Sequence, residues 1–192
     1  MSSKQLYLSF DVEADGPVPG PFSMLSLGAV VFNLEDESTS SFYKVLSPLP
    51  DATQDPDTMK FWQRNPKAWE AVNINQESPV EVMKAFEEWV RGLGQRPIPV
   101  AFPSGFDFTF VYWYSVVFLG KSPLGFSCLD LKSYAAAVLK TDYRKSTKRC
   151  FPQRWKQGLP KHTHLAIDDA LEQAILARRI LIENLDNASD KV

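Results

Sequence analysis

Hydrophobic and polar positions predict strands in the first quarter of the chain. Apolar segments at 4–12 and 24–32 have the length and composition of buried strands, and 40–47 alternates as a partly exposed strand does. A loop rich in Pro and Gly, residues 15–23, separates the first two segments. Consecutive strands of this kind can pair as an antiparallel meander.

The pattern then changes to helical periodicity. Short helices are expected over 56–72, interrupted at Pro66. The segment 78–93 predicts a longer helix, with Ser78 as its N-cap and Glu81 as the capping-box partner. One face of this helix carries apolar residues at the i, i+3, i+4, i+7 spacing: Val82, Ala85, Phe86, Trp89 and Val90.

Strands and helices alternate in the second half of the chain. A buried strand at 97–102 precedes an aromatic-rich helix that opens at Asp107. A short strand at 126–130 precedes a helix capped by Asp130, and a long helix over 164–185 closes the sequence. Strands first, and then strands alternating with helices, predict an α/β fold built on a mixed sheet.

The length and composition indicate one soluble domain. The 192 residues suit a single domain over 1–192, with a short polar tail at about 186–192. No apolar run approaches the ~18 residues of a membrane helix, and the N-terminus does not resemble a signal peptide. Only two cysteines are present, Cys128 and Cys150, so a disulfide framework is excluded and a cytoplasmic location is expected.

The net charge of −2 conceals a basic segment. Residues 140–161 contain eight Lys or Arg and a single acid, Asp142, which gives a local charge of +7. One interpretation is a solvated charged loop. The other is a patch that contacts the phosphate backbone of a nucleic acid.

Three acids stand at the end of the first strand. Asp11 and Glu13 point to the same side of that strand, because side chains alternate with a period of two. Strand spacing alone also admits Asp15. Neighbouring carboxylates rarely both ionise without a cation, and hard oxygen ligands suit Mg²⁺ or Mn²⁺. A solvated acidic turn is the alternative.

The sequence argues against two other hypotheses for these acids. Asp11, Glu13, Asp15 and Gly16 resemble the start of a calcium-binding EF-hand loop, but Phe22 stands where that loop needs a bidentate Glu. Prolines interrupt the loop, and a strand precedes it where an EF-hand has a helix. A phosphatase of the haloacid-dehalogenase type would need an Asp in place of Glu13.

Further candidates lie at two predicted helix starts. Asp107 opens the aromatic helix, where it either caps the helix or serves a site, and its neighbour Phe106 is either core or a base-stacking surface. His164 and Asp169 are five residues apart, about 140° around a helix. They can meet only if His164 lies in the preceding loop and Asp169 faces inward, with Asp168 turned away. The alternative is an ordinary acid-rich helix start.

Together, three motifs resemble the DEDD superfamily of 3′-5′ exonucleases, in the subclass that has a histidine in the third motif (DEDDh). The motifs are FDVEADG at 10–16, FPSGFDFTFV at 102–111 and HTHLAIDDA at 162–170, and the resemblance extends over about 6–183. It implies an α/β ribonuclease-H-like mixed β-sheet flanked by α-helices. The second motif lacks the usual His- and Asn-rich lead, which leaves the choice between RNA and DNA open.

The resemblance implies a metal-dependent 3′-5′ exonuclease that acts on single-stranded nucleic acid, with RNA slightly favoured over DNA. It implies two divalent cations, Mg²⁺ or Mn²⁺, and His164 as the general base. His162 is a competitor for that role, but it stands five residues before Ile167 and not before an acid. The implied metal ligands are Asp11, Glu13, Asp107 and Asp169.

Substrate contacts are predicted around this centre. Phe22 or Met24 in the loop after the first strand is expected to stack on the terminal base, with burial as the alternative. Asp15 is assigned to a turn near the substrate entrance. The full set of predicted contacts is Phe22, Met24, Phe106, Arg149 and Lys161. The resemblance also allows a homodimer.

Two alternatives to an active exonuclease are considered. The first is a catalytically inactive nucleic-acid-binding module on the same fold, which the intact set of five site residues argues against. The second is an unrelated phosphodiesterase or metal-binding protein that uses only some of the acids.

Overall fold

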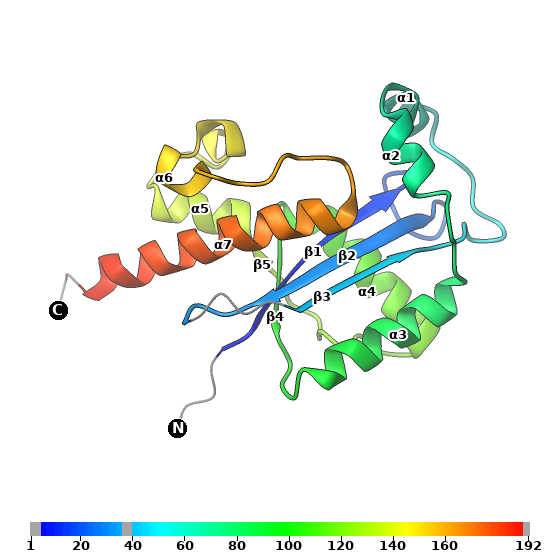
Figure 1. Ribbon diagram of the computed structural model, residues 1–192, viewed down its shortest axis with the longest axis horizontal. Helices are drawn as coiled ribbons and strands as arrows, with labels where there is room; N and C mark the ends of the chain where they lie inside the picture. The colour runs from blue at the N-terminus through cyan, green and yellow to red at the C-terminus, as the bar shows by residue number, and fades with distance from the viewer. Residues whose placement is uncertain (1–4, 36–39, 190–192) are drawn as a thin grey trace.

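Five strands form a single mixed sheet in the order β3-β2-β1-β4-β5 (Figure 1). The computed structural model describes residues 5–35 and 40–189. The first three strands pair antiparallel, whereas β4 and β5 run parallel to β1, as the sequence predicts for a mixed sheet. The strands are β1 Tyr7–Ala14, β2 Met24–Phe32, β3 Ser40–Val45, β4 Ile98–Ala101 and β5 Leu129–Asp130.

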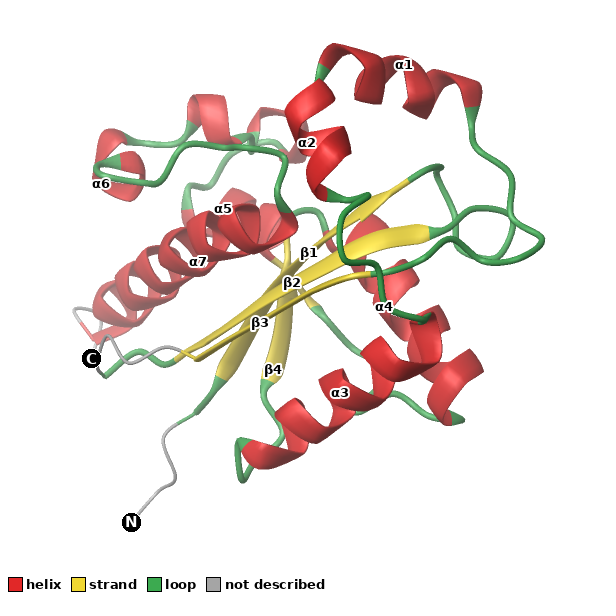
Figure 2. Cartoon of the chain, turned by 45° about the vertical axis from the view of Figure 1, so that its right-hand side comes forward, coloured by secondary structure: helices red, strands yellow, loops and turns green. Residues whose placement is uncertain are grey.

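Helices cover both faces of this sheet (Figure 2). The helices α3 and α4 pack against one face, and α5, α6 and α7 pack on the other. Two 3₁₀ turns, η1 at Tyr143–Lys145 and η2 at Lys148–Cys150, lie in the basic segment. The α-helices are α1 Pro56–Arg64, α2 Pro66–Ala71, α3 Pro79–Gly92, α4 Ser104–Leu119, α5 Leu131–Val138, α6 Gln153–Lys156 and α7 Ala166–Ser189.

The predicted capping residues are confirmed. Ser78 accepts a hydrogen bond from the Glu81 N–H and donates its hydroxyl to the Glu81 carboxylate. Together with this hydroxyl, the backbone N–H of Ser78 bonds to that carboxylate and lowers the pKa of Glu81, as the reciprocal bond of a capping box does. Asp130 caps α5 by accepting the Ser133 N–H. The break between α1 and α2 falls at Pro66, because a proline ring cannot continue the helix before it.

Two helix boundaries differ from the prediction. The aromatic helix α4 begins at Ser104, so Asp107 lies inside its first turn and is not the N-cap. The last helix runs to Ser189, so the polar tail expected from about residue 186 is helical up to that point. The rest of the tail, 190–192, lies outside the described residues. Polar residues continue a helix readily where no Gly or Pro ends it.

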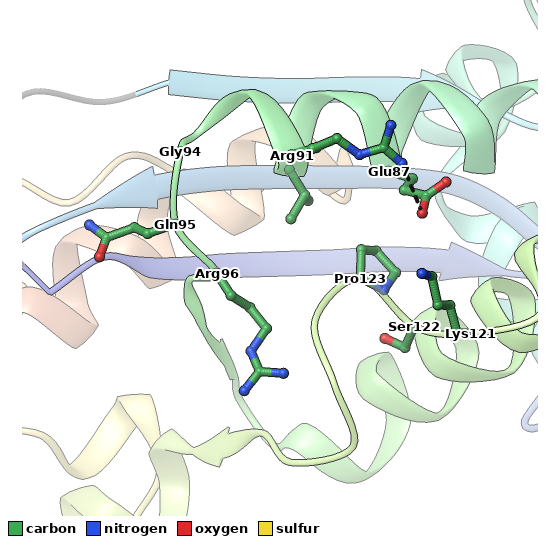
Figure 3. A pocket seen from close by; sticks show the side chains of 9 residues that line it. Glu87, Arg91, Gly94, Gln95, Arg96, Lys121, Ser122 and Pro123 are labelled. Atoms are coloured by element: carbon green, nitrogen blue, oxygen red, sulfur yellow. Dashed lines mark ion pairs between the residues drawn. The ribbon is translucent and has the colours of Figure 1, made fainter.

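A hollow of about 420 Å³ opens between the C-terminal part of α3 and the loop after α4 (Figure 3). Its charged lining includes Arg91, which pairs with Glu87 at 3.3 Å, and also Arg96 and Lys121. In Figure 3, Arg96 and Lys121 lie on opposite sides of Pro123. The cations therefore do not converge on a single point.

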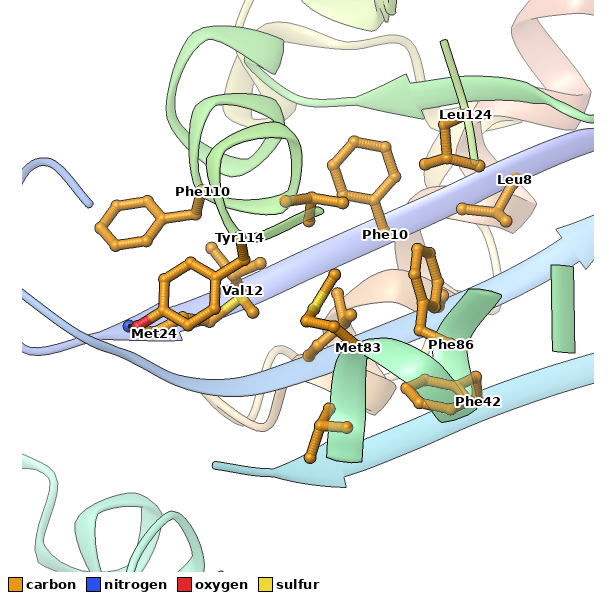
Figure 4. Close-up of a cluster of buried hydrophobic side chains, with 14 of the residues drawn as sticks. Leu8, Phe10, Val12, Met24, Phe42, Met83, Phe86, Phe110, Tyr114 and Leu124 are labelled. Carbon is orange, nitrogen blue, oxygen red and sulfur yellow. Dashed lines mark hydrogen bonds between the residues drawn. The ribbon is translucent and has the colours of Figure 1, made fainter. Parts of the chain in front are cut away.

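Alternation along β1 divides the core into two layers. Leu8, Phe10 and Val12 face α3 and α4, where they pack with Phe86 and Tyr114 (Figure 4). The intervening side chains of β1 point to the other face, toward α7. Asp11 and Glu13 belong to this second set, so the register of β1 aims both carboxylates at the start of α7.

Within the part of the chain that the structure describes, no helix is long and apolar enough to cross a bilayer. Cys128 and Cys150 are free thiols. A single exonuclease domain over 1–192, a cytoplasmic location and a homodimer stay predictions.

Candidate active site

A pocket of about 310 Å³ opens where the end of β1 meets the N-terminal ends of α4 and α7. Three segments that are far apart in the sequence contribute to its lining. Phe106 and His162 also line it. All five predicted site residues meet here: Asp11, Glu13, Asp107, His164 and Asp169.

Carboxylates converge at the base of this pocket. Oxygen atoms of Asp11, Glu13 and Asp169 lie within 4.8 Å of one another. Asp107 is buried, and its Oδ1 accepts the backbone N–H of Val12 at 3.1 Å. This bond ties the first turn of α4 to β1, so the fourth carboxylate is held beside the other three.

Burial and mutual repulsion disfavour negative charge on these acids. Burial, followed by the charges of Asp107, Glu13 and Asp169, raises the pKa of Asp11 well above its usual range. Burial raises the pKa of Glu13 to about 8 and that of Asp107 to about 7. A set of carboxylate oxygens that repel one another fits a divalent cation, because the positive charge would stabilise the ionised form of these carboxyl groups.

These shifts predict how the stability of the metal-free protein depends on pH. The folded state holds protons that the unfolded state releases above its lower carboxyl pKa values of 3.8 and 4.5. The stability that these protons contribute in EDTA should therefore be fully present below about pH 4 and be lost as the pH rises toward about 8. Thermal unfolding between these pH values measures this loss, and Mn²⁺ should reverse it. A melting temperature in EDTA that stays constant or rises across the interval would contradict the argument.

A glycine lets α7 approach the sheet. Gly28 of β2 pairs with Asp11, and a Cβ at Gly28 would lie 2.2 Å from the carbonyl carbon of Ala166 and 2.4 Å from the nitrogen of Ile167. No other side chain fits this space, so Gly28 permits the approach that places Asp169 beside Asp11. The sequence carries a signal for this contact that the prediction missed, since an isolated Gly inside a strand marks a close backbone approach.

Buried hydrogen bonds fix α7 against β1. The hydroxyl of Ser9 donates to the carbonyl of Ala170 at 2.9 Å. The side-chain amide of Gln173 donates to Ser9 Oγ at 2.9 Å and to the Phe10 carbonyl at 3.1 Å. Buried polar groups of this kind are costly when unpaired, so they favour a single position of the helix.

Both histidines of the third motif face the pocket. His164 lies in the loop before α7, as predicted, with a left-handed backbone (φ 59°) that is uncommon for residues other than Gly. The centre of its ring lies 4.4 Å from the ring centre of His162 and 5.0 Å from that of Phe61, and both contacts are edge-on. Asp168 accepts the hydroxyl of Thr163 at 2.8 Å, so it turns toward the loop and not into the pocket.

The two imidazoles have different surroundings. His162 Nδ1 lies 2.8 Å from Asp169 Oδ1, and this hydrogen bond raises the pKa of His162. Burial and the neighbouring His162 lower the pKa of His164, which favours its neutral form near pH 7. A neutral imidazole can accept a proton, so His164 has the protonation state that a general base needs.

Two predictions for the loop after β1 are wrong. Met24 is fully buried in the core beside Tyr114, so it cannot stack on a base. Asp15 lies in the turn after β1, as predicted, but it is buried and does not line the pocket: its carboxylate accepts the N–H of Ser23 and braces the loop. Phe22 is half-buried against Gly16, and its contact with substrate stays a prediction.

The other predicted contacts are accessible. Phe106 lines the pocket with 39% of its surface exposed. Arg149 and Lys161 are exposed on the basic segment. Phe61 of α1, which the sequence did not single out, contacts His164 from a helix more than 100 residues earlier in the chain.

The basic segment is only partly free to meet phosphates. Arg154 forms two hydrogen bonds of 2.7 Å to Glu183, and Lys148 lies 2.6 Å from Glu172. Lys145 pairs with the single acid of the segment, Asp142, at 3.3 Å. Some cations of the segment therefore have protein partners and others are exposed, and a contact between the segment and phosphates stays a prediction.

Comparisons with known proteins agree with this geometry. Residues 7–181 match the sequence family described as the 3′-5′ exoribonuclease Rv2179c-like domain. The 3′-5′ DNA exonuclease Cap18 of Escherichia coli is 30% identical over 189 residues, covering 93% of each chain.

Solved structures share the fold. The nuclease domain of 3′hExo, a DEDDh family member bound to rAMP, has a TM-score of 0.71 and 14% identity, covering 95% of this chain and 94% of that one. Pop2p of S. pombe, in a form bound to Mg²⁺ and Mn²⁺, has a TM-score of 0.59 and 17% identity, covering 92% and 81%. The expected ribonuclease-H-like fold is confirmed.

The fold and the sequence match define the class of protein: a 3′-5′ exonuclease on a ribonuclease-H-like fold. Within that class, the chain belongs to the Rv2179c-like 3′-5′ exoribonuclease family.

Proposed function

We propose that this exonuclease is metal-dependent and shortens single-stranded nucleic acid from the 3′ end, with RNA slightly favoured over DNA. The observation that carries the proposal is the convergence of Asp11, Glu13, Asp107 and Asp169 on one pocket beside the imidazole of His164. The description of the family supports RNA as substrate, whereas the name of the E. coli relative points to DNA. Both substrates therefore belong in the test.

The acids fit two divalent cations, Mg²⁺ or Mn²⁺. Asp11, Glu13 and Asp169 would hold one cation, and Asp11 with Asp107 would hold the second, either directly or through a water molecule. When bound, such cations stabilise negative charge on the attacking and leaving oxygens of a phosphoryl displacement. The structure of Pop2p with Mg²⁺ and Mn²⁺ makes both metals reasonable to test.

The residues around the acids have complementary roles in the proposal. His164 accepts a proton from the attacking water, for which its lowered pKa is suited. Phe61 packs edge-on against its ring and limits its rotation. His162 is hydrogen-bonded to Asp169 and orients that carboxylate. The exposed ring of Phe106 offers a stacking surface for a base.

The proposal is tested with 5′-labelled single-stranded RNA and DNA of one sequence, with Mg²⁺ or Mn²⁺. Wild-type protein should produce a ladder of products shortened one nucleotide at a time. His164→Ala should lower kcat by about 10²–10⁴-fold, because general-base catalysis contributes about that much. His162→Ala should lower it less, since in the proposal it acts through Asp169.

Other outcomes have distinct meanings. Binding without shortening, by the wild-type protein under either metal, would contradict the proposal and favour an inactive binding module. Internal fragments would indicate an endonuclease. If His162→Ala abolished activity and His164→Ala did not, the general base would be His162. Comparing the initial rates on the two oligomers decides between RNA and DNA.

A further inference from the structure

A lysine at the rim of the pocket is placed differently from the other cations of the basic segment with a described partner, Lys145, Arg154 and Lys156. Lys148 opens the 3₁₀ turn η2, and its ammonium lies 2.6 Å from the carboxylate of Glu172 and 5.9 Å from the centre of the Phe102 ring. Phe102 lines the same pocket as Asp11 and Asp107. The positive charge of Lys148 is therefore held at the edge of the acidic site.

The charge of Lys148 acts on the carboxylates of the pocket. It opposes the effect of burial by lowering the pKa of Asp11 and of Asp107. Neighbouring cations of the segment are directed elsewhere: Arg154 to Glu183, and Lys156 to the carbonyl of Arg149. Lys148 therefore differs from these neighbours in having the acids within reach of its charge.

The face of α7 that presents a site acid also positions this lysine. Glu172 follows Asp169 by three residues, so the two side chains lie on the same face of the helix. Glu172 is buried, and its carboxylate lies 3.8 Å from His162 Nδ1, which in turn contacts Asp169. These contacts place Lys148 relative to the carboxylates through a single rigid element.

The ammonium keeps bonding capacity toward solvent. A lysine ammonium has three N–H donors, and the side chain of Lys148 is 34% exposed beside its bond to Glu172. A partly exposed cation at the mouth of an acidic pocket suits a phosphate oxygen, because charge-assisted hydrogen bonds to phosphate are strong.

We propose that Lys148 contacts a non-bridging phosphate oxygen of the strand that enters the pocket, and that Glu172 is the positioning residue for Lys148. This inference rests on the proposed function, since it assigns a substrate contact within the same site. It makes Lys148 a determinant of strand binding at the mouth of the pocket, separate from the acids that hold metal.

The test measures binding of a fluorescein-labelled single-stranded oligomer, with Ca²⁺ in place of Mg²⁺, as NaCl is increased. Lys148→Met should weaken binding about tenfold at low salt and reduce the slope of log affinity against log salt by about 0.7, the value for one lost phosphate contact. Lys148→Arg should retain most of the affinity and most of the salt slope of the wild-type protein. With Mg²⁺, Lys148→Met should raise KM more than it lowers kcat.

Lys44→Met is the matched control. Lys44 also pairs with a glutamate at 2.6 Å, Glu77, and its side chain is 37% exposed, but it lies on β3 and not at this pocket. This variant should keep the salt slope and bind within about twofold of wild type. Glu172→Gln should give a KM between those of wild type and Lys148→Met, because it releases Lys148 without removing it.

Three results would overturn the inference. Equal weakening by Lys148→Met and Lys44→Met would indicate a diffuse charge effect. A change in the metal concentration needed for activity, with an unchanged salt slope, would assign Lys148 to tuning the metal site. The proposed function can fail separately from this inference. If the wild-type protein does not shorten strands but Lys148→Met still reduces the salt slope, the exonuclease proposal is wrong and the phosphate contact of Lys148 is supported. A wild-type protein that shortens strands, with Lys148→Met indistinguishable from it in slope and KM, overturns the lysine assignment alone.

Discussion

Replacing Asp11 with asparagine is expected to abolish exonuclease activity while raising the thermal stability of the metal-free protein. Asp11 interacts with all three other acids of the site. Burial raises its pKa, and the charges of Asp107, Glu13 and Asp169 raise it further. Asparagine has almost the same shape but carries no charge, so it relieves the repulsion and weakens the binding of cations. Activity and stability should therefore move in opposite directions.

The magnitudes allow a clear test. Activity should fall by about 10³-fold or more, because the stabilisation of charge in the transition state depends on the metal site. In EDTA at pH 7.5, the melting temperature should rise by a few degrees, given that ~1 kcal/mol corresponds to about 2–4 °C for a domain of this size. The increase in melting temperature on addition of Mn²⁺ should be smaller for Asp11→Asn than for the wild-type protein. Calorimetry with and without Mn²⁺ measures both effects.

Asp57→Asn is the matched control for this substitution. Asp57 is also an aspartate, but its side chain is 86% exposed on α1 and pairs only with exposed Lys60 in the contacts described. It should leave both activity and the response to Mn²⁺ unchanged. If Asp11→Asn instead destabilised the metal-free protein, the acids would not be repelling one another in the folded state.

Replacing Gly28 with alanine is expected to cause the second large loss. The added Cβ would overlap the backbone of Ala166 and Ile167, so the first turn of α7 must move away from β2. Asp169 lies on that turn, and a displacement of about 1 Å at a site can cost about 10²-fold in rate. Overpacking should also destabilise the fold by about 1–3 kcal/mol. Activity, thermal unfolding and the Mn²⁺-dependent rise in melting temperature together test this expectation.

Gly92→Ala controls for the change of residue type. Gly92 ends α3, and a Cβ there meets no atom within 4 Å. Alanine in a helix is favoured over glycine by about 0.5–1 kcal/mol, so this variant should be as stable as wild type or slightly more stable. If Gly28→Ala kept full activity and the full response to Mn²⁺, the close approach of α7 would not be what positions Asp169.

The sequence was most informative where local physical chemistry decides the outcome. The second strand, 24–32, matches the predicted segment in full, because its length, its β-branched residues and the loop rich in Pro and Gly before it favour a strand over a buried helix. Ser78 and Asp130 cap their helices as predicted, since a side-chain acceptor beside unpaired backbone N–H groups acts over a few residues. The period of two along β1 also placed Asp11 and Glu13 on one face.

Predictions that depended on distant packing were less successful. Asp15 and Met24 were both expected near the substrate, yet both are buried. Their burial depends on α4 and on the folding of the loop at 15–23, which contribute Tyr114 and Ser23 from outside β1. A loop sequence rich in Pro and Gly indicates a turn, but it does not indicate which side chains other elements will cover.

By itself, the sequence determined the class of fold, the order of its elements and the residue types able to bind metal, because these follow from periodicity and from three local motifs. Only the tertiary structure decided which groups surround the acids: His162 lines the pocket together with His164, Phe61 of α1 contacts His164, and Glu172 holds Lys148. The contact of Phe61 with His164 joins residues 103 positions apart, and that of Lys148 with Glu172 joins residues 24 positions apart. Their distances depend on how closely α7 packs on the sheet, and Gly28 permits that approach.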